Sequence, residues 1–517
     1  MRVWVQLAWV CAFAVGCGGP LTEEPPPEEV SEQESSDEGA PGEVSAQWNR
    51  TKLGTPFLVE DIFPPLTPAP PPLPIEGPLP TDLVDFRGTL FFAANFTSGE
   101  SALWRSDGTA PGTFAVREFE VTGVSGLTVV GRRLFFVASD SVHGTELWVS
   151  DGTTAGTRLL RDITPGGVSS ELEGLTRVGD TLFFYRRLSS ETSGERLELW
   201  RSDGTEAGTV RVKELGPGFA LFELTALDDD TLFFVADDGE HGFEPWVSDG
   251  TARGTRLLRD IRPGPDSSGV MRPTRVDDGL LYFSAEEPAH GRELWRTDGT
   301  RRGTELVEDT VPGPEGSGAQ PIALFKRRLY FVTFEPADRG ARLRKLDPDP
   351  DCHPRSTVIE DLPNPFPDFP QVSAFLPAGG IAEVNGRLLF TLAYSTSGPA
   401  LADVQLWATR GTARTTELLR RRLVNAIDIP VATLTAVNED LALFAAADAE
   451  HGQEPWVTDG TLRGTRLLMD INPGPANAFP FDFTRSGDFM FFVANDGVHF
   501  HELWAVPVGD TRHRAGR

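Results

Sequence analysis

Short apolar runs separated by turn residues make up most of this chain. Residues 175–178 and 182–185 are two such runs, and Gly179 and Asp180 lie between them. Runs of this length bounded by Gly, Asp and Pro are typical of β-strands, and a Gly-Asp pair between two of them is typical of a hairpin turn. A third run carries Glu-Leu-Trp, and a fourth follows a Gly-Thr pair, as at residues 255–258. The pattern therefore predicts units of four short antiparallel strands.

The four-run unit is repeated along most of the chain. Its third run carries a Trp at intervals of 44 to 52 residues, apart from one interval of 112. A degenerate copy without Trp fills that gap, in which residues 329–332 are followed by residues 342–346. With this copy there are nine units. The repeated Trp residues are Trp104, Trp148, Trp200, Trp246, Trp295, Trp407, Trp456 and Trp504.

Units of about this length with four strands each match the blades of a β-propeller. A solenoid and stacked β-sandwiches are the alternatives, although sandwich units usually run to about 100 residues. We therefore predict an all-β chain with a single β-propeller over residues 47–510, with nine blades. Nine exceeds the usual four to eight, so the degenerate copy around Arg344 is the weakest of the predicted blades.

The two ends of the repeat region predict how the ring closes. Residues 54–62 match residues 254–261, which form a fourth strand, yet they precede every complete unit. At the other end, residues 481–504 supply three strands and no fourth. We expect the first strand, residues 53–62, to be the outer strand of the last blade. Such a split blade leaves no unpaired edge at the seam.

The repeated motif resembles a known family. Glu146-Leu147-Trp148 followed by Asp151-Gly152-Thr153 is similar to the signature of the bacterial ELWxxDGT-repeat proteins, which are surface or secreted proteins, and the string returns around Trp200 and Trp295. Copies at Trp246 and Trp456 carry Pro245 and Pro455 in place of Leu. The resemblance covers about residues 53–506. It implies family membership and provides no catalytic residues.

A second resemblance concerns packing. Ala138, Asp140, Gly144 and Trp148 fit the tryptophan-docking motif of quinoprotein-type propellers, as do the corresponding residues around Trp246. This resemblance implies that each Trp packs between neighbouring blades and that Ala and Gly make room for its ring. Quinoprotein dehydrogenases hold their cofactor over vicinal cysteines, which this chain lacks. The resemblance therefore extends to packing and not to a cofactor.

The first residues predict where in the cell the protein is located. An apolar run over residues 3–15 is too short for a permanent membrane helix but fits a signal peptide. The sequence Ala14-Val15-Gly16-Cys17 resembles a bacterial lipobox. This implies a lipoprotein signal peptide over residues 1–16 and a lipid on Cys17, with an ordinary cleaved signal as the alternative. Gly18 provides no inner-membrane retention signal under the enterobacterial rule. The expected location is the cell envelope, at the outer membrane or cell surface.

Residues 17–46 continue as a tether. Nine acids and no Lys or Arg fall within residues 18–46, among runs of Pro, Glu and Ser, so this segment cannot bury a core. A second Pro-rich stretch occupies residues 64–80, and residues 511–517 form a basic tail. The whole chain has 517 residues and a net charge of −29, which argues against a nucleic-acid partner. We expect a monomeric domain attached to the membrane through its lipid.

Candidate chemistry is sparse, because nearly every polar residue is repeated. The histidines at one place of the motif belong to different blades, so they should lie too far apart to share a metal. The sequence has no HExxH, GxSxG, P-loop or CxxC motif, and Cys352 stands alone beside His353. The chain therefore predicts no catalytic constellation and no enzyme activity. The repeated histidines are His143, His241, His290, His451 and His499.

Two weaker signals concern ligands. Oxygen-rich loops with Asp238, Glu244, Asp249 and Asp260 could hold a structural Ca²⁺, although turn capping explains the same residues. Arginines at one position of the innermost strand could line a cationic channel mouth for an acidic ligand such as a glycan. Ion pairs with acids of the same or the adjoining blade are the alternative. These arginines are Arg177, Arg275 and Arg485.

Together these features predict a non-catalytic, surface-anchored propeller for ligand or protein binding or scaffolding in the cell envelope. The partner would be a glycan or an envelope protein, and no cofactor is expected. The alternative is a glycan-acting hydrolase or lyase on a propeller scaffold, which needs paired carboxylates at one mouth of the channel.

Overall fold

The computed structural model describes residues 51–62, 79–96, 99–121, 123–190, 194–215, 221–276, 279–334, 340–347, 355–369, 372–377, 379–396, 402–423 and 434–510. The chain divides into two compact units, Met1–Trp48 and Asn49–Arg517, and every element below belongs to the second. The predicted signal peptide, the lipidation site Cys17, the tether, most of the second Pro-rich stretch, Cys352 and the basic tail lie outside the described residues.

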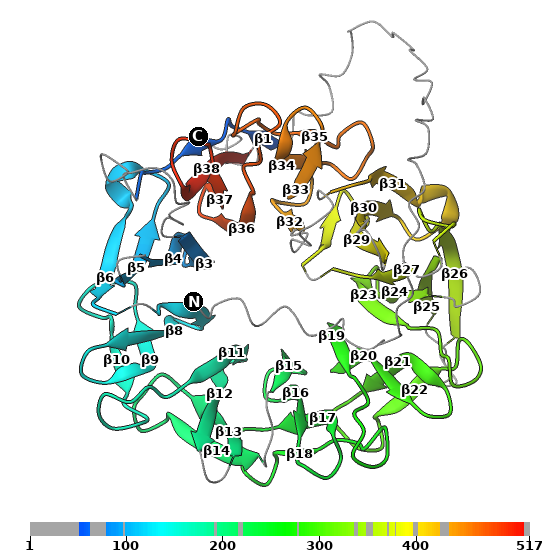
Figure 1. The fold of residues 1–517 in the computed structure, drawn as a ribbon, viewed down its shortest axis with the longest axis horizontal. Helices are drawn as coiled ribbons and strands as arrows, with labels where there is room; N and C mark the ends of the chain where they lie inside the picture. The colour runs from blue at the N-terminus through cyan, green and yellow to red at the C-terminus, as the bar shows by residue number, and fades with distance from the viewer. Residues whose placement is uncertain are drawn as a thin grey trace, which may run out of the picture. The chain divides into compact units, whose positions relative to one another are not determined.

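Nine antiparallel sheets follow one another along the chain and form the nine blades of a β-propeller (Figure 1). The predicted fold class and blade number are confirmed. In chain order, blade 1 has β3 to β6 (Leu79–Phe86, Thr89–Asn95, Ser101–Ser106, Phe114–Phe119) and blade 2 has β7 to β10 (Ser125–Val130, Arg133–Asp140, Gly144–Ser150, Arg158–Arg161). Blade 3 has β11 to β14 (Leu172–Val178, Thr181–Ser190, Gly194–Ser202, Val210–Leu215) and blade 4 has β15 to β18 (Phe222–Ala226, Leu232–Asp237, Phe243–Ser248, Arg256–Leu257).

Blades 5 to 8 continue the series, and blade 9 is shared between the two ends. They are β19 to β22 (Met271–Val276, Leu280–Glu287, Gly291–Thr297, Glu305–Glu308), β23 to β26 (Gln320–Phe325, Arg328–Phe334, Ala341–Asp347, Arg355–Leu362), β27 to β31 (Val372–Phe375, Ile381–Val384, Arg387–Thr396, Ala402–Thr409, Glu417–Arg420) and β32 to β35 (Leu434–Ala436, Ala442–Asp448, Gly452–Thr458, Arg466–Leu467). Blade 9 has β36 (Phe481–Ser486), β37 (Phe489–Asn495), β38 (His501–Asp510), β1 (Thr51–Leu53) and β2 (Phe57–Leu58).

The ring closes through the split blade that the sequence predicts. Both β1 and β2 pair antiparallel with β38, so Leu53 lies opposite Val508 and Leu58 opposite Trp504. The backbone N–H of Val59 also donates to the carbonyl of Leu503 at 3.0 Å. The first described residues therefore complete the sheet whose other three strands come from the end of the chain (Figure 1).

The degenerate copy is a full blade. Its strands β23 to β26 pair in the same order as those of the other blades. Arg344 lies opposite Phe331, where Trp148 lies opposite Phe136 in blade 2. The loss of the Trp therefore changes the side chain between the blades and leaves the strand pairing unchanged.

The hydrophobic core is divided into clusters, most of which join two neighbouring blades. The cluster around Trp148 combines Phe86 and Phe91 of blade 1 with Phe136 of blade 2. The rings of Phe136 and Trp148 stack with centroids 6.4 Å apart. Because each blade offers one face to the blade before it and one to the blade after it, most strand residues are buried on both faces. Continuous apolar runs such as residues 134–138 follow from this arrangement.

The Asp-Gly-Thr motif forms the loop between the third and fourth strands. In blade 2, the carboxylate of Asp151 accepts hydrogen bonds from the backbone N–H and the hydroxyl of Thr153, at 2.9 and 2.7 Å. A Cβ at Gly156 would lie 2.0 Å from Oδ1 of Asp151, so only glycine fits there. The motif is therefore explained by turn geometry alone.

Among the described elements there is no helix long and apolar enough to cross a membrane.

Candidate functional site

The Glu of the Glu-Leu-Trp motif is a buried structural acceptor. Glu146 is fully buried, and its carboxylate accepts the backbone N–H groups of Ile163 and Thr164 at 3.0 and 3.1 Å and the hydroxyl of Ser170. These donors belong to the connection that leads to the next blade. We call this arrangement the glutamate latch. Fully buried glutamates occupy the same place at Glu244, Glu293, Glu454 and Glu502.

The latch carboxylates have perturbed pKa values. Burial raises the pKa of Glu244 and Glu454 to about 7, because desolvation penalises the charged form more than the hydrogen bonds favour it. A raised carboxyl pKa is often a catalytic feature. Here it recurs around the ring and each carboxylate is occupied by backbone donors, so it belongs to the architecture.

Each repeated His is held by an acid of its own blade. Nδ1 of His143 lies 2.9 Å from Oδ2 of Asp140, and this hydrogen bond raises the pKa of His143. The negative charge of Asp162, on the connection to the next blade, acts in the same direction. In all five blades with this His, Oδ1 of the connection Asp is buried without a hydrogen-bond partner among the described residues. These acids are Asp61, Asp162, Asp260, Asp309 and Asp470.

The four acids considered for calcium have separate tasks. Asp238 binds His241, Asp249 caps Thr251, and Glu244 forms the latch. Asp260 is the connection acid of that blade. In the described part of the chain there is no group of three His, Cys, Asp or Glu that could hold a metal ion.

The three inner-strand arginines turn back to nearby turns. Nε of Arg177 donates to the carbonyl of Gly179 at 2.9 Å. Arg485 donates to the carbonyls of its own turn, including that of Phe489 at 2.8 Å. Arg275 forms an ion pair with Asp229 of the preceding blade at 3.2 Å. Each guanidinium therefore has a local partner, and the described contacts do not bring the three together.

The Trp side chains lie between blades, and the motif glycine has another task. Trp246 belongs to one hydrophobic cluster with Leu199 of blade 3, and only 7% of its surface is exposed. A Cβ at Gly144 would lie 2.9 Å from the backbone nitrogen of Ser169, on the connection to the next blade. The resemblance to the docking motif implies that this Gly makes room for the indole. The structure instead shows that it makes room for the connection, in a backbone with φ of +68°.

Two acids on the inner strands are brought together by ring closure. Asp82 in blade 1 and Asp482 in blade 9 occupy equivalent bulges with positive φ. Oδ2 of Asp82 accepts the N–H of Gly126 at 2.5 Å, and Oδ2 of Asp482 accepts the N–H of Leu83 at 3.1 Å. Burial raises both pKa values, and the charge of Asp82 raises that of Asp482 further. The pair thus connects blades 9, 1 and 2.

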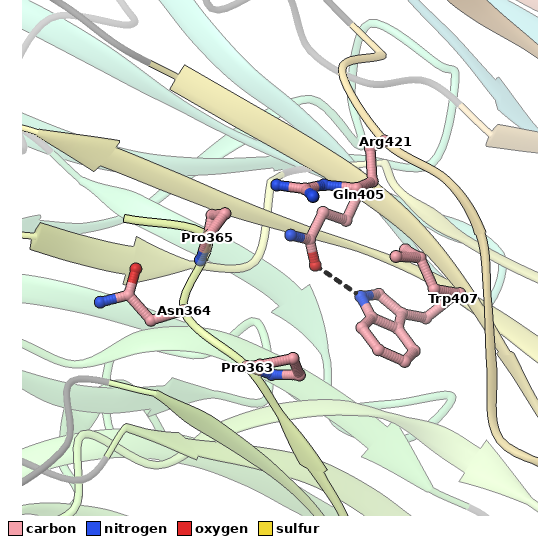
Figure 2. Close-up of a pocket in the computed structure, with 7 residues that line it drawn as sticks. Pro363, Asn364, Pro365, Gln405, Trp407 and Arg421 are labelled. Carbon is pink, nitrogen blue, oxygen red and sulfur yellow. Dashed lines mark hydrogen bonds between the residues drawn. The ribbon is translucent and has the colours of Figure 1, made fainter. Parts of the chain in front are cut away.

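Blade 7 breaks the pattern of the latch and contains a pocket. The pocket has a volume of about 230 Å³ and is lined by Pro363, Asn364, Pro365, Gln405, Trp407, Leu418 and Arg421. Figure 2 shows the Arg421 guanidinium, the Gln405 amide and the Trp407 indole on one side, with the segment that carries Pro363, Asn364 and Pro365 on the other. That segment follows the outer strand of blade 6.

A buried acid organises the polar wall of the pocket. Asp403, only 2% exposed, accepts Nε of Arg421 at 3.0 Å and Nε2 of Gln405 at 3.0 Å through Oδ2. Its Oδ1 accepts the backbone N–H of Arg422 at 2.9 Å. The Trp407 indole N–H donates to Oε1 of Gln405 at 2.9 Å (Figure 2). The Arg421 side chain remains 52% exposed.

Neither the inner acid pair nor the blade 7 pocket follows from the repeated motif in the sequence. Alignment of the repeats contains a signal for both. Asp82 and Asp482 replace glycines such as Gly126, and Arg421 replaces an acid such as Asp162. At these positions the residue varies from blade to blade, with Glu223 and Arg272 at the inner-strand bulge of blades 4 and 5, and a search for repeated residues passes over them.

No protein family model matches this chain, and no curated protein resembles it in sequence. Among solved structures it is similar to a puromycin hydrolase mutant, with 16% identity over 72% of this chain and a TM-score of 0.34. This chain spans 58% of the length of that enzyme. It is also similar to the β-propeller domain of the Trilobed protease from Pyrococcus furiosus, with 12% identity over 68% of this chain and 99% of that chain and a TM-score of 0.31. A third similar structure is an oligogalacturonate lyase in complex with manganese, with 11% identity over 83% of this chain and 88% of that chain and a TM-score of 0.35.

Proposed function

We propose that this protein is a lipid-anchored propeller of the cell envelope that binds a glycan or an envelope protein and performs no chemistry on it. The anchor follows from the lipobox at Cys17 and the acidic tether after it. The propeller would then be held away from the membrane as a binding or scaffolding domain.

The observation that carries this proposal is the use of the repeated polar groups. The latch glutamates, the motif aspartates and the histidines all bond within the ring, as Glu146, Asp151 and His143 do in blade 2. Catalysis needs groups that are free to meet a substrate in a set that occurs once. Polar groups that form hydrogen bonds within turns and blade connections stabilise a rigid ring, and a rigid ring is suited to present a binding surface.

A glycan-acting hydrolase or lyase is the second candidate, and one observation favours it. Asp82 and Asp482 form a pair of half-buried carboxyls with raised pKa values, as acid catalysis on a sugar requires. Each, however, has an oxygen that accepts a backbone N–H of the next blade. We therefore assign the pair to ring closure.

The experiment that decides between the two is a glycan array probed with residues 47–517, followed by product analysis of each bound glycan. Binding without turnover is the expected result. Hydrolysis or elimination of any glycan would contradict the proposal, and loss of that turnover in Asp82→Asn and Asp482→Asn would move the site to the inner acid pair. A parallel screen against envelope proteins covers a polypeptide partner.

A further inference from the structure

We propose that the pocket between blades 6 and 7 binds a carboxylate of a polypeptide partner, with Arg421 and Asn364 as its donors. The inference rests on the proposed binding function and names a ligand class and a site for it. Four features lead to it: the change of charge within the repeat, the free donors, the acceptors that already hold hydrogen bonds, and the shape of the walls.

The first feature is a reversal of charge at one place of the ring. Strand pairing puts Leu418 opposite Trp407 as it puts Leu159 opposite Trp148, so Arg421 stands where blade 2 has Asp162. By the same register, Gln405 stands where the latch glutamate Glu146 lies. Two negative charges that blade 2 has at these places are thus replaced by a positive and a neutral group.

The buried Asp403 compensates for only part of this change. It stands at the position of Gly144 and holds Arg421 through Nε and Nη2, at 3.0 and 2.9 Å. These contacts fix the plane of the guanidinium and leave Nη1 without a partner among the described residues. A guanidinium fixed in this way binds a carboxylate with little further loss of side-chain freedom.

The second and third features concern which groups remain free. Oδ1 of Asn364 accepts the backbone N–H of Phe366 at 2.8 Å, and Oε1 of Gln405 accepts the Trp407 indole. Both amide oxygens already accept these hydrogen bonds, and both oxygens of Asp403 accept bonds on the protein side. Nη1 of Arg421 and Nδ2 of Asn364 have no partner among the described residues, so the polar groups of these side chains that make no hydrogen bond are N–H donors.

Free donors beside oxygens that already accept hydrogen bonds select the ligand. A sugar offers mainly hydroxyl groups, which need acceptors as well as donors, whereas a carboxylate only accepts. The remaining walls are apolar, with Pro363, Pro365 and Leu418 beside the edge of Trp407. A volume of about 230 Å³ fits one acidic side chain with a neighbouring ring such as proline. We therefore favour a polypeptide carboxylate over an acidic sugar.

Fluorescence anisotropy with three labelled peptides tests the proposal on the full-length protein in detergent. The first has one Glu between prolines and blocked ends, the second has Gln in its place, and the third is the Gln peptide with a free C-terminal carboxylate. We expect the Glu peptide to bind at least about tenfold more tightly than the blocked Gln peptide. Tight binding of the third peptide as well would assign the site to chain ends.

The variants are Arg421→Gln and Asn364→Leu, with Arg211→Gln as the matched control. Arg211 is also 52% exposed and also bound to a buried acid, Glu198, at 2.7 Å, but in blade 3. We expect the first two variants to abolish the preference for Glu and the control to keep it. Arg421→Gln leaves Asp403 with the bonds from Gln405 and Arg422, and the melting temperature shows whether the ring stays folded.

Three outcomes would overturn the pocket assignment: no peptide binds, the Glu and Gln peptides bind alike, or both pocket variants keep the preference while folded. In each case the glycan array and envelope-protein screen still report on the proposed function. A ligand found there whose binding is unaffected by Arg421→Gln would leave the binding function intact and place it elsewhere. If neither assay finds a ligand, the binding function fails as well.

Discussion

Ile62 donates its backbone N–H to the carboxylate of Glu502, 440 positions later in the sequence, at 3.2 Å. In blade 2 the same bond joins residues only 17 positions apart, because Ile163 donates to Glu146 at 3.0 Å. In blade 9 the first described segment therefore supplies both the outer strand and the donor of the glutamate latch. Closure of the ring therefore depends on residues that follow the predicted tether in the sequence.

Deletion of residues 51–63 should destabilise the whole propeller. The segment contributes the pairing of Leu53 with Val508 and buries Val59 and Ile62, which are 5% and 8% exposed. Burial of two such side chains is worth about 3–6 kcal/mol, and the deletion also exposes a sheet edge. Differential scanning calorimetry of residues 47–517 should show a melting temperature lower by more than about 5 °C.

A shorter deletion provides the control for closure. Removal of residues 47–50, which precede β1, should leave the melting temperature within about 1 °C. An unchanged melting temperature after the longer deletion would mean that the N-terminal strand is dispensable for the ring.

Trp246→Ala should cost about 3–5 kcal/mol of unfolding free energy, the usual range for an emptied aromatic site in a core. The indole is 7% exposed, stacks on Phe234 with centroids 6.2 Å apart and packs against blade 3. Urea denaturation measures the loss. Phe114→Ala is the control, because Phe114 is 45% exposed and should change stability by less than about 0.5 kcal/mol. A loss below about 1 kcal/mol for Trp246→Ala would contradict its place between the blades.

Stability should fall as the pH rises from about 5.5 to 8. Hydrogen bonds to acids raise the pKa of His143 and its equivalents, so their contribution is present below pH 6.5 and is lost as pH rises through the folded pKa. Burial raises the pKa of Glu244 and Glu454 from 4.5 to about 7, so the folded state also binds more protons there. Both groups therefore change stability in the same direction, which a series of thermal melts across this pH range will measure.

The variant Glu244→Gln with Glu454→Gln should flatten this dependence, because both groups lose their titration while keeping an acceptor oxygen. Glu206→Gln is the control, since Glu206 is exposed. On the acid side, burial works to raise the pKa of Asp140, but the bonds from His143 and the backbone lower it overall. That contribution is lost as pH falls below about 3.8, so the optimum should lie between the two limits. A flat profile from pH 5.5 to 8 in the wild type would refute this account.

Cys17→Ser tests the anchor. The substitution removes the thiol that a lipid would occupy, so we expect release from membranes or accumulation of the uncleaved precursor. Membrane fractionation with mass spectrometry of the N-terminus measures both. Cys11→Ser should have no effect on the mature protein, because Cys11 would be removed with the signal peptide. Unchanged membrane association of a fully processed Cys17→Ser protein would eliminate the lipoprotein proposal.

The sequence by itself determines the strands, the nine blades and the split closure. These features are local or periodic: apolar runs specify strands, Gly179 and Asp180 specify a turn, and residues 54–62 repeat the pattern of residues 254–261. Because the copies can be aligned with one another, the alignment shows that the last copy lacks a fourth strand. It also shows that the extra strand before the first copy can take that place. Arg344 in place of a Trp weakened the prediction of one blade, yet strand pairing there relies on the backbone.

Only the tertiary structure decides what the polar residues do. In the sequence, Glu146 is only one residue of the repeated Glu-Leu-Trp motif. Its burial under the connection to the next blade depends on how two blades pack together. Gly144 follows the docking motif, yet its neighbour is the backbone at Ser169. Asp82 and Asp482 are 400 positions apart and come together through ring closure. The pocket at Arg421 requires a wall from the end of blade 6, because contacts between repeats depend on side-chain direction, which periodicity does not encode.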